Sequence, residues 1–443
     1  MPQSIRDAVS RFDLESRTVV YAVCPKCHCT YKPQYDGGST QGIYKKTCTN
    51  RPKPKFGICG ESLLHHVDDD GHQVMKPLKP FIYHDLHDYL ASLLSQPDLE
   101  SAMDKSCNDL MEVHSDPIPE HVMDIWQVEF LRTFKGLLGK TLFIDGQGEG
   151  RYGFTLNIDF FNVEGIKVCG ATTSCGIISM VCLNLPYDIR YDSENIFIAS
   201  IIPGPHTPST MDLTHYIKPL IDDLVVSWEN GVRYSRTTSH PMGRMTHSAI
   251  IAAVIDLPAA RHASQLAGHG SHFYCSVCQC FHLSTLGRID HEQWVLCDAE
   301  EMGHSAYKWL NVSSTREWEL IFQKHGGHWS ELWQLSYWNP TWQLVVDAMH
   351  CILEGQAQHH FCIVLGLTSL SAATSAPPEL AFSHNFTKVD PDDKPFPNDM
   401  NLKEVKQVAT IHQLLMAALG GTDSHGRVVD QGAFDQSLDD LTR

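Results

Sequence analysis

The stretch Ile250-Ile251-Ala252-Ala253-Val254-Ile255 runs directly into Asp256-Leu257-Pro258-Ala259-Ala260. Six consecutive apolar residues, three of them Ile, predict a buried strand that delivers one carboxylate, Asp256, at its tip. A pair of thiols, Cys275-Ser276-Val277-Cys278, follows shortly. An Asp after an apolar strand often only caps the turn or helix that comes next, so Asp256 alone does not define a site.

The residues before this strand predict a mixed α/β fold. Phe154, Leu156 and Ile158 alternate with Thr155, Asn157 and Asp159, which is the period of a strand with one face inward. Apolar runs and a helical stripe then predict two further strands and a helix that contains Pro219, at 177–185, 195–202 and 212–228 respectively. Strand, strand, strand, helix, strand is the order of a ribonuclease-H-like core.

In such a core the first strand and the strand after the helix are neighbours. Asp159 and Asp256 would then meet near the centre of the sheet and repel each other unless a cation lies between them. Mg²⁺ or Mn²⁺ is the expected cation, because carboxylate oxygens and waters satisfy such ions. Two ions of this kind can cut and join phosphodiesters.

An amino-terminal cluster of cysteines predicts a small zinc ribbon. Cys24-Pro25-Lys26-Cys27 forms one thiol pair, and Cys48 and Cys59 form a second, wider pair. A segment this short and polar cannot form a core without a bound ion or a disulfide. His28 and Cys29 remain alternative ligands. The alternative to a zinc ribbon is a flexible basic arm whose cysteines bind no metal.

Charge is distributed unevenly along the chain. The net charge is −18, yet residues 1–60 hold ten Lys or Arg against four Asp or Glu, a net of +6, which leaves −24 for the remaining 383 residues. DNA phosphates are contacted by Lys and Arg, so the amino-terminal module is the expected place for DNA binding. The candidate residues are Lys45, Lys46, Arg51, Lys53 and Lys55, with a solvated basic loop as the alternative.

Length and composition limit the class of protein to which the chain can belong. A chain of 443 residues, 42% hydrophobic, can bury a sizeable core and divide into several domains. We expect no membrane partner and an intracellular location, because no apolar run approaches the roughly 20 residues of a spanning helix and no secretory signal is evident. Fifteen cysteines then fit metal ligands better than disulfides. Helical spacing predicts a helix at 84–94, and polar, acidic residues predict a linker at 95–124.

Several ordered motifs between about residues 20 and 367 resemble the CACTA (En/Spm-type) transposases of fungi. The motifs are Cys24-Pro25-Lys26-Cys27 with Cys48 and Cys59, Phe154–Asp159 with Phe161-Asn162, Val181–Pro186, Ile201–Pro205, Gly231-Val232-Arg233, Asp256–Arg261, Cys275–Cys278 and Val346–His350. The resemblance implies a DDE recombinase that acts on DNA with terminal inverted repeats, in the nucleus, and works as a homo-oligomer.

By position in these motifs, Asp159 and Asp256 correspond to the first two catalytic carboxylates. The resemblance also makes Cys275 and Cys278 half of a second zinc site inside an insertion, with His350 the candidate that completes it. The remaining place is left open among His304, Cys297, Cys280, His282 and His360.

The chain departs from the family where the third catalytic acid is expected. No Phe-Glu-Arg-Phe-like motif follows His350, so a C-terminally truncated chain that is inactive alone is the expectation. Glu354 or Asp347 could substitute in a metal-dependent nuclease. A further alternative is a zinc-dependent DNA- or protein-binding factor without catalysis.

These observations predict five segments. They are a zinc-ribbon-like module at 18–65, a helix and linker at 66–124, a ribonuclease-H-like core at 125–262, a zinc-containing helical insertion at 263–367 and a poorly ordered tail at 368–443.

Overall fold

The computed structural model describes residues 17–36, 42–52, 57–69, 72–144, 148–162, 174–204, 206–268, 270–281 and 290–361. The chain forms two compact units, Met1–Val346 and Asp347–Arg443, each of which is described by itself. The predicted tail at 368–443 lies outside the described residues.

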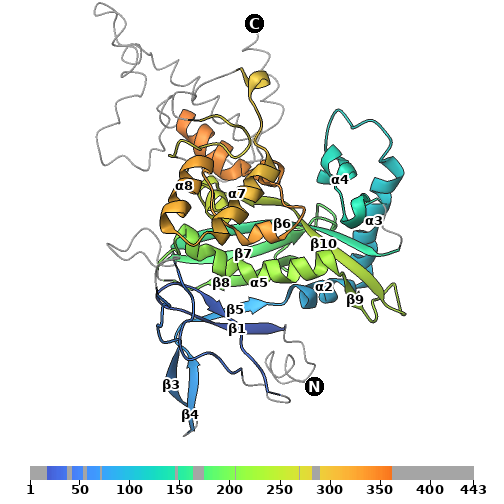
Figure 1. The fold of residues 1–443 in the computed structure, drawn as a ribbon. Helices are drawn as coiled ribbons and strands as arrows, with labels where there is room; N and C mark the ends of the chain where they lie inside the picture. The colour runs from blue at the N-terminus through green and yellow to red at the C-terminus, as the bar shows by residue number, and fades with distance from the viewer. Residues whose placement is uncertain are drawn as a thin grey trace, which may run out of the picture. The chain divides into compact units, whose positions relative to one another are not determined.

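The first unit is mixed α/β, as predicted (Figure 1). Its strands are β1 (Thr18–Val23), β2 (Thr30–Tyr31), β3 (Leu64–Asp69), β4 (His72–Pro77), β5 (Pro80–His84), β6 (Gly150–Asn162), β7 (Ser174–Cys182), β8 (Ile196–Ile202), β9 (Val232–Tyr234), β10 (Arg244–Ile255) and β11 (Leu344–Val346). Its α-helices are α2 (Leu86–Leu94), α3 (Pro97–Val113), α4 (Glu129–Thr133), α5 (Thr210–Glu229), α6 (Leu257–Ala263), α7 (Ala299–Asn311), α8 (Thr315–His325) and α9 (Pro340–Gln343). Short 3₁₀ turns are η1 (Ile125–Gln127), η2 (Leu137–Gly139), η4 (His291–Gln293) and η5 (Glu331–Gln334).

A nine-stranded sheet organises this unit. Its strand order is β11-β10-β6-β7-β8-β5-β1-β2, and β9 pairs with β10 off this path. The strand β7 runs antiparallel to both of its neighbours, β6 and β8, whereas β10 runs parallel to both β6 and β11. A separate β3-β4 hairpin forms a second, two-stranded sheet. The chain therefore returns through α5 before β10 joins the middle of the sheet.

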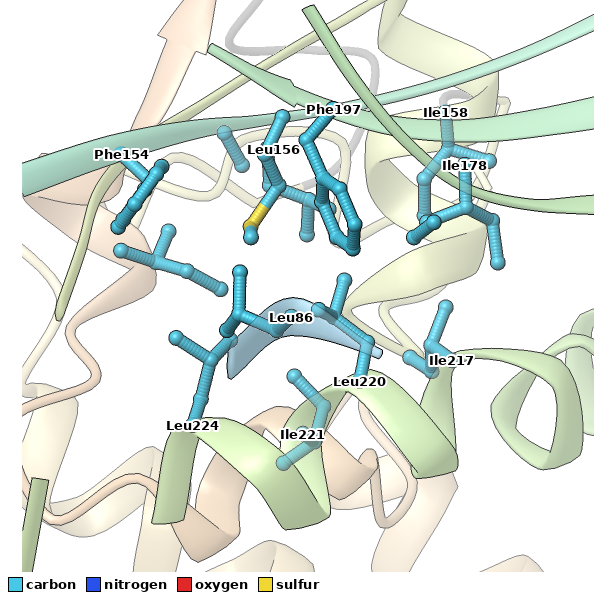
Figure 2. Close-up of a cluster of buried hydrophobic side chains, with 14 of the residues drawn as sticks. Leu86, Phe154, Leu156, Ile158, Ile178, Phe197, Ile217, Leu220, Ile221 and Leu224 are labelled. Carbon is cyan, nitrogen blue, oxygen red and sulfur yellow. The ribbon is translucent and has the colours of Figure 1, made fainter. Parts of the chain in front are cut away.

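One face of the sheet packs against α5. Phe154, Leu156 and Ile158 of β6 point toward the apolar stripe of α5, which includes Ile217 and Leu220 (Figure 2). All five side chains are at most 1% exposed. Fully burying a large apolar side chain contributes about 1.5–3 kcal/mol, so this layer supplies a large part of the favourable free energy of the unit.

A second, smaller apolar cluster includes the residues of β10 on either side of Ile250. Ala249 and Ile251 of β10 meet aromatic rings that include Phe143 and Trp228. The register of β10 on β6 shifts between Ile250 and Ala252. This irregularity keeps Ile250 and Ala253 in the same apolar cluster, although a regular strand would put residues three positions apart on opposite faces.

Most of the sequence-based elements are confirmed. The strands predicted around Phe154–Asp159 and at 177–185 and 195–202 correspond to β6, β7 and β8, and the strand that ends at Asp256 is β10. The helices predicted at 84–94 and 212–228 correspond to α2 and α5. The linker predicted at 95–124 is wrong for Pro97–Val113, which forms α3. Pro at the first helical position and acids in the first turn favour helix, and three well-spaced buried residues, Glu100, Met103 and Leu110, hold it on the sheet.

Glu100 is a buried carboxylate of α3 with no exposed surface. It accepts hydrogen bonds from the Thr237 hydroxyl at 2.7 Å and the Ser239 amide at 2.7 Å, and Arg244 Nη1 lies 3.3 Å away. Burial by itself would raise the pKa of Glu100, but these hydrogen bonds lower it below its usual value. The unfolded chain therefore binds a proton more readily, so the stability that Glu100 contributes is present at neutral pH and is lost as the pH falls through the folded pKa.

Replacing Glu100 by Ala should lower the free energy of unfolding by about 3–5 kcal/mol at pH 7, because it leaves Arg244 buried without this partner. Urea denaturation followed by tryptophan fluorescence would measure the change. The matched control is Asp109→Asn on the same helix, where an exposed Lys105–Asp109 pair at 2.5 Å should be worth less than about 1 kcal/mol. Equal effects of the two substitutions would contradict the role given to the buried carboxylate.

Candidate functional site

The amino-terminal cysteines form a compact four-sulfur cluster. The ligand atoms of Cys24, Cys27, Cys48 and Cys59 all lie within 4.8 Å of one another. The Sγ atoms of Cys24 and Cys59 are 3.7 Å apart, and those of Cys27 and Cys48 are 3.5 Å apart. Tetrahedral zinc with Zn–S bonds of about 2.3 Å requires S–S separations of about 3.8 Å. The cluster can therefore hold one zinc ion with little movement.

Backbone turns place these four thiols. The Cys24–Cys27 pair lies on a turn closed by the His28 amide, which donates to the Cys24 carbonyl at 3.0 Å. The second pair is joined by a loop in which the Gly60 amide donates to the Cys48 carbonyl at 3.0 Å. Gly60 has φ +70°, in the left-handed region that favours glycine.

Burial changes how readily the thiols of the cluster ionise. Burial raises the pKa of both Cys24 and Cys27, so these thiols resist ionisation by themselves. Burial also opposes ionisation of Cys48, but a hydrogen bond from the Tyr31 hydroxyl, 3.2 Å from Sγ, helps to lower its pKa. Because a bound metal ion deprotonates the thiols that coordinate it, zinc would remove the cost of burying them.

The two alternative ligands lie outside this cluster. The His28 Nδ1 atom is 2.8 Å from the Tyr216 hydroxyl of α5. The Cys29 thiol points toward the Thr30 carbonyl at 4.0 Å. The Thr30 hydroxyl in turn donates to the His215 carbonyl at 3.0 Å. The residues next to the thiol pair therefore attach the module to α5.

Three of the five basic candidates are described. Lys45, Lys46 and Arg51 are exposed on the loop that carries the second thiol pair, and Lys45 Nζ lies 5.6 Å from the centre of the Tyr31 ring. Lys53 and Lys55 lie outside the described residues. Contact of these side chains with DNA stays a prediction.

The two candidate carboxylates lie on neighbouring parallel strands. The pairing of β10 with β6 continues to Ala253 opposite Leu156, and the Asn157 side chain then donates to the Val254 carbonyl at 2.8 Å. Asp159 and Asp256 each lie three positions beyond the last pair of this register, Asp159 within β6 and Asp256 directly after β10. Asp159 is exposed, three residues before the end of β6, and alternates with Phe154, Leu156 and Ile158, whose side chains face the other way.

Asp256 also begins the helix that follows it. Its Oδ1 atom accepts the Ala259 amide hydrogen at 2.7 Å, which makes it the N-cap of α6. The expectation that Asp256 caps the following helix is thus confirmed. A carboxylate has several lone pairs, so a cap formed through Oδ1 leaves Oδ2 able to bind a cation.

Two thiols of the second predicted zinc site, those of Cys275 and Cys278, lie close together. Cys278 Sγ lies 3.2 Å from Cys275 Sγ, and the Cys278 amide donates to the same sulfur at 3.4 Å. Burial, together with the neighbouring thiols of Cys275 and Cys280, raises the pKa of Cys278 to about 12. Cys280 and Cys297 line the same pocket as this pair.

The histidines proposed to complete that site belong to different parts of the chain. His304 is exposed on α7, and His282 lies outside the described residues. His350 and His360 belong to the second unit, where η6, a π-helix, spans Met349–Ala357. Within it His350 Nδ1 is 2.5 Å from Asp347 Oδ2. The role of His350 as a zinc ligand stays a prediction.

Asp347 and Glu354, the possible third acids, lie in the same unit. Burial alone would raise the pKa of Asp347, but the hydrogen bond with His350 lowers it. Glu354 is exposed. Assignment of either residue as a catalytic ligand stays a prediction.

The sequence reasoning missed one cluster of possible ligands. Glu100, Asp104 and His240 have ligand atoms within 4.8 Å of one another. Arg244 Nη1 lies 2.7 Å from Asp104 Oδ2 and contacts Glu100 as well, so a guanidinium already supplies the positive charge. Residues about 140 positions apart carry no spacing signal, which is why the sequence did not reveal this network.

The central part of the chain matches the model of a known protein family. Residues 154–323 match a model described as transposase family tnp2. The match contains both candidate carboxylates and the Cys275–Cys278 pair, and it supports a transposase or a protein derived from one. A comparison with curated proteins found no match. Within the described ranges, no helix is both long and apolar enough to cross a bilayer.

Replacing Cys27 by Ser should remove one zinc equivalent from the purified chain, because three sulfurs and a weakly coordinating hydroxyl leave the tetrahedral site incomplete. Metal analysis after dialysis against a chelator would measure the loss. The matched control is Cys29→Ser two residues away, which should retain the zinc of the parent chain. A loss of zinc from the control and not from Cys27→Ser would show that the ligands are assigned wrongly.

Proposed function

We propose that this chain is a DNA transposase of the CACTA type, or a degenerate relative of one, with Asp159 and Asp256 as metal-binding carboxylates. The observation that carries the proposal is the parallel pairing of β6 with β10, because extending that pairing by the same offset would bring the two acids level with each other. The match to transposase family tnp2 over residues 154–323 supports DNA as the substrate. Action on genomic DNA would place the protein in the nucleus.

The strand order supports a ribonuclease-H-like core. Across the sheet, β8, β7 and β6 pair with one another antiparallel, and β10 and β11 then follow β6 in parallel. Along the chain, β6, β7 and β8 come first, and α5 lies between β8 and β10. This is the plan in which the first and fourth strands deliver acids to one edge of the sheet.

The donor set fits a hard divalent cation. Asp159 is exposed, and no hydrogen bond to its carboxylate occurs among the described residues. Asp256 keeps one oxygen after capping α6. Mg²⁺ or Mn²⁺, when bound, would activate a water or a 3′-hydroxyl and stabilise the leaving oxygen of the phosphodiester.

The protein residues then position that cation. The α6 cap holds the Asp256 carboxylate in one orientation through the Ala259 amide. The bond from Asn157 to the Val254 carbonyl locks the two strands together next to the acids. Rigid placement of this kind matters because the attacking oxygen and the phosphorus must be aligned to within a fraction of an ångström.

The amino-terminal module would contact the DNA backbone. It combines a four-cysteine cluster suited to zinc with exposed Lys45, Lys46 and Arg51, which are side chains of the kind that contact phosphates. Joining two element ends requires both to be held together, so we propose that the active form is a homo-oligomer that binds terminal inverted repeats.

A second candidate function is a zinc-dependent DNA-binding factor without catalysis. The observation that favours it is a contrast among the described residues: the four cysteines form a complete cluster, whereas Asp159 and Asp256 belong to no group of three close ligand atoms. Loss of one ligand of a catalytic metal site typically costs several kcal/mol of barrier. Binding and cleavage therefore have to be measured separately.

The test is Mg²⁺- or Mn²⁺-dependent nicking of supercoiled DNA by the full chain. Asp159→Asn and Asp256→Ser should each lower the nicking rate at least about a hundredfold, equivalent to about 2.7 kcal/mol of barrier. Ser is chosen at position 256 because it still caps a helix but lacks a carboxylate. The variant therefore separates the capping role from metal binding.

Asp192→Asn, at an exposed acid in the loop before β8, is the matched control and should nick DNA at the parent rate. If the parent chain and all variants are inert while DNA still shifts in a gel, the binding factor is the better description. Equal nicking by the parent and Asp256→Ser would refute the role of that carboxylate.

A further inference from the structure

A pocket lies beside the first turns of α5. Its volume is about 640 Å³, which is within the range of small-ligand sites in proteins. Three parts of the first unit line it: the amino-terminal turns of α5, the cysteine module through Asn50 and Arg51, and the region from α7 to η5. Segments far apart in the sequence therefore share this space.

Hydrogen bonds to α5 fix the other two parts around the pocket. The Thr30 hydroxyl of the cysteine module donates to the His215 carbonyl at 3.0 Å. The Glu331 amide of η5 donates to the Thr214 hydroxyl at 3.3 Å. Because the lining is already assembled, a ligand could enter without a large cost in ordering the protein.

Indole rings give the pocket flat apolar surfaces. Trp309, Trp318 and Trp329 all line it. The Trp309 and Trp318 rings stack on each other with centroids 4.1 Å apart and an interplanar angle of 19°. Trp309 is 5% exposed, whereas Trp318 and Trp329 are half-buried and keep some surface free. Partly free aromatic surfaces of this kind are those on which nucleobases stack, whatever the base.

Two of these indoles also bury a hydrogen-bond donor. The Nε1 atoms of Trp309 and Trp318 are buried and have no hydrogen-bond partner among the described residues. A buried indole N–H usually finds an acceptor, because leaving it unpaired costs free energy. An acceptor on a molecule in the pocket would satisfy these donors. Nucleobases carry ring nitrogens and carbonyl oxygens that accept hydrogen bonds.

Charged side chains of both signs border the pocket. Arg51 is exposed and belongs to the same loop as Lys45 and Lys46, so cations continue from the pocket along the cysteine module. Asp212 and Glu331 line the pocket with carboxylates. These acids would repel a free phosphate. A nucleotide, in contrast, can place its phosphate near Arg51 and offer the amino group of its base to a carboxylate.

We propose that this pocket binds one unstacked nucleobase of single-stranded DNA. The base would lie against the half-buried indoles, and its phosphate would contact Arg51. An apolar side chain of a peptide would also cover the indoles, but it would leave the Trp309 and Trp318 donors unpaired. The inference rests on the proposed function in that it takes DNA as the substrate, but it requires no metal at Asp159 or Asp256.

The first experiment measures binding of a fluorescein-labelled single strand of about twelve nucleotides to the full chain by fluorescence anisotropy, without divalent cations. Trp329→Ala should weaken this binding at least about fivefold, the low end of the loss expected for one base stack. The matched control is Trp342→Ala, which removes a 65% exposed indole of α9 outside the pocket lining and should bind as the parent does.

Both variants should bind a duplex of the same length as tightly as the parent does, because paired bases are not free to enter the pocket. Retained duplex binding also shows that Trp329→Ala has folded. Equal single-strand affinity of the parent and Trp329→Ala, which is the result expected if water or a protein segment fills the pocket, would overturn the inference. An equal loss in Trp342→Ala would overturn it as well.

The nicking assay distinguishes failure of this inference from failure of the proposed function. If the parent nicks DNA while Trp329→Ala keeps full affinity for the single strand, the nucleobase pocket is refuted and the transposase proposal stands. If the parent binds neither single-stranded nor duplex DNA, both are refuted.

The second experiment needs no variant. Single strands that carry 5-iodouracil at each position in turn are irradiated with the full parent chain, and the crosslinked peptides are identified by mass spectrometry. Crosslinks should form at Trp309, Trp318 or Trp329. Crosslinks at Trp342 without any at these three tryptophans would refute the assignment of the pocket.

Discussion

The parallel hydrogen bonding of β10 with β6 is the constraint on which the rest of the first unit depends. The two strands are separated by β7, β8, α5 and β9 along the chain, so their pairing closes a long loop at a cost in conformational entropy. Their pairing inserts the apolar run at Ile250 into the centre of the sheet, between two apolar clusters. It also brings the ends of both strands, with Asp159 and Asp256, to the same edge.

The amino-terminal module has few apolar side chains, and cysteine thiols form much of its buried centre. Around Cys24, Cys27 and Cys48 the buried cluster contains few apolar side chains besides Leu63 and Leu64. The module nevertheless extends the central sheet through β1 and β2, and His28 joins it to Tyr216 of α5. A zinc ion at this cluster would therefore support an edge of the main sheet as well as its own loops.

Local patterns predicted the elements of the sheet well, because burial on one face leaves a period that can be read along the chain. The alternation from Phe154 to Asp159 and the apolar run at Ile250 are such patterns. The linker at 95–124 failed because α3 buries a carboxylate, Glu100, at a position where a core residue is expected to be apolar. Its partners lie about 140 residues away, and no local rule anticipates them.

The residue types at the candidate sites follow from the sequence by itself: one acid within a strand, another after a strand, and cysteines in pairs at metal-ligand spacing. Only the tertiary structure decided which of these come together. Strand pairing, and not spacing, puts β10 beside β6, and an isolated β-bridge pairs Cys278 with Leu296, the residue next to Cys297. The physical reason is that spacing governs contacts within a turn or helix, whereas contacts between distant segments depend on how all the intervening elements pack.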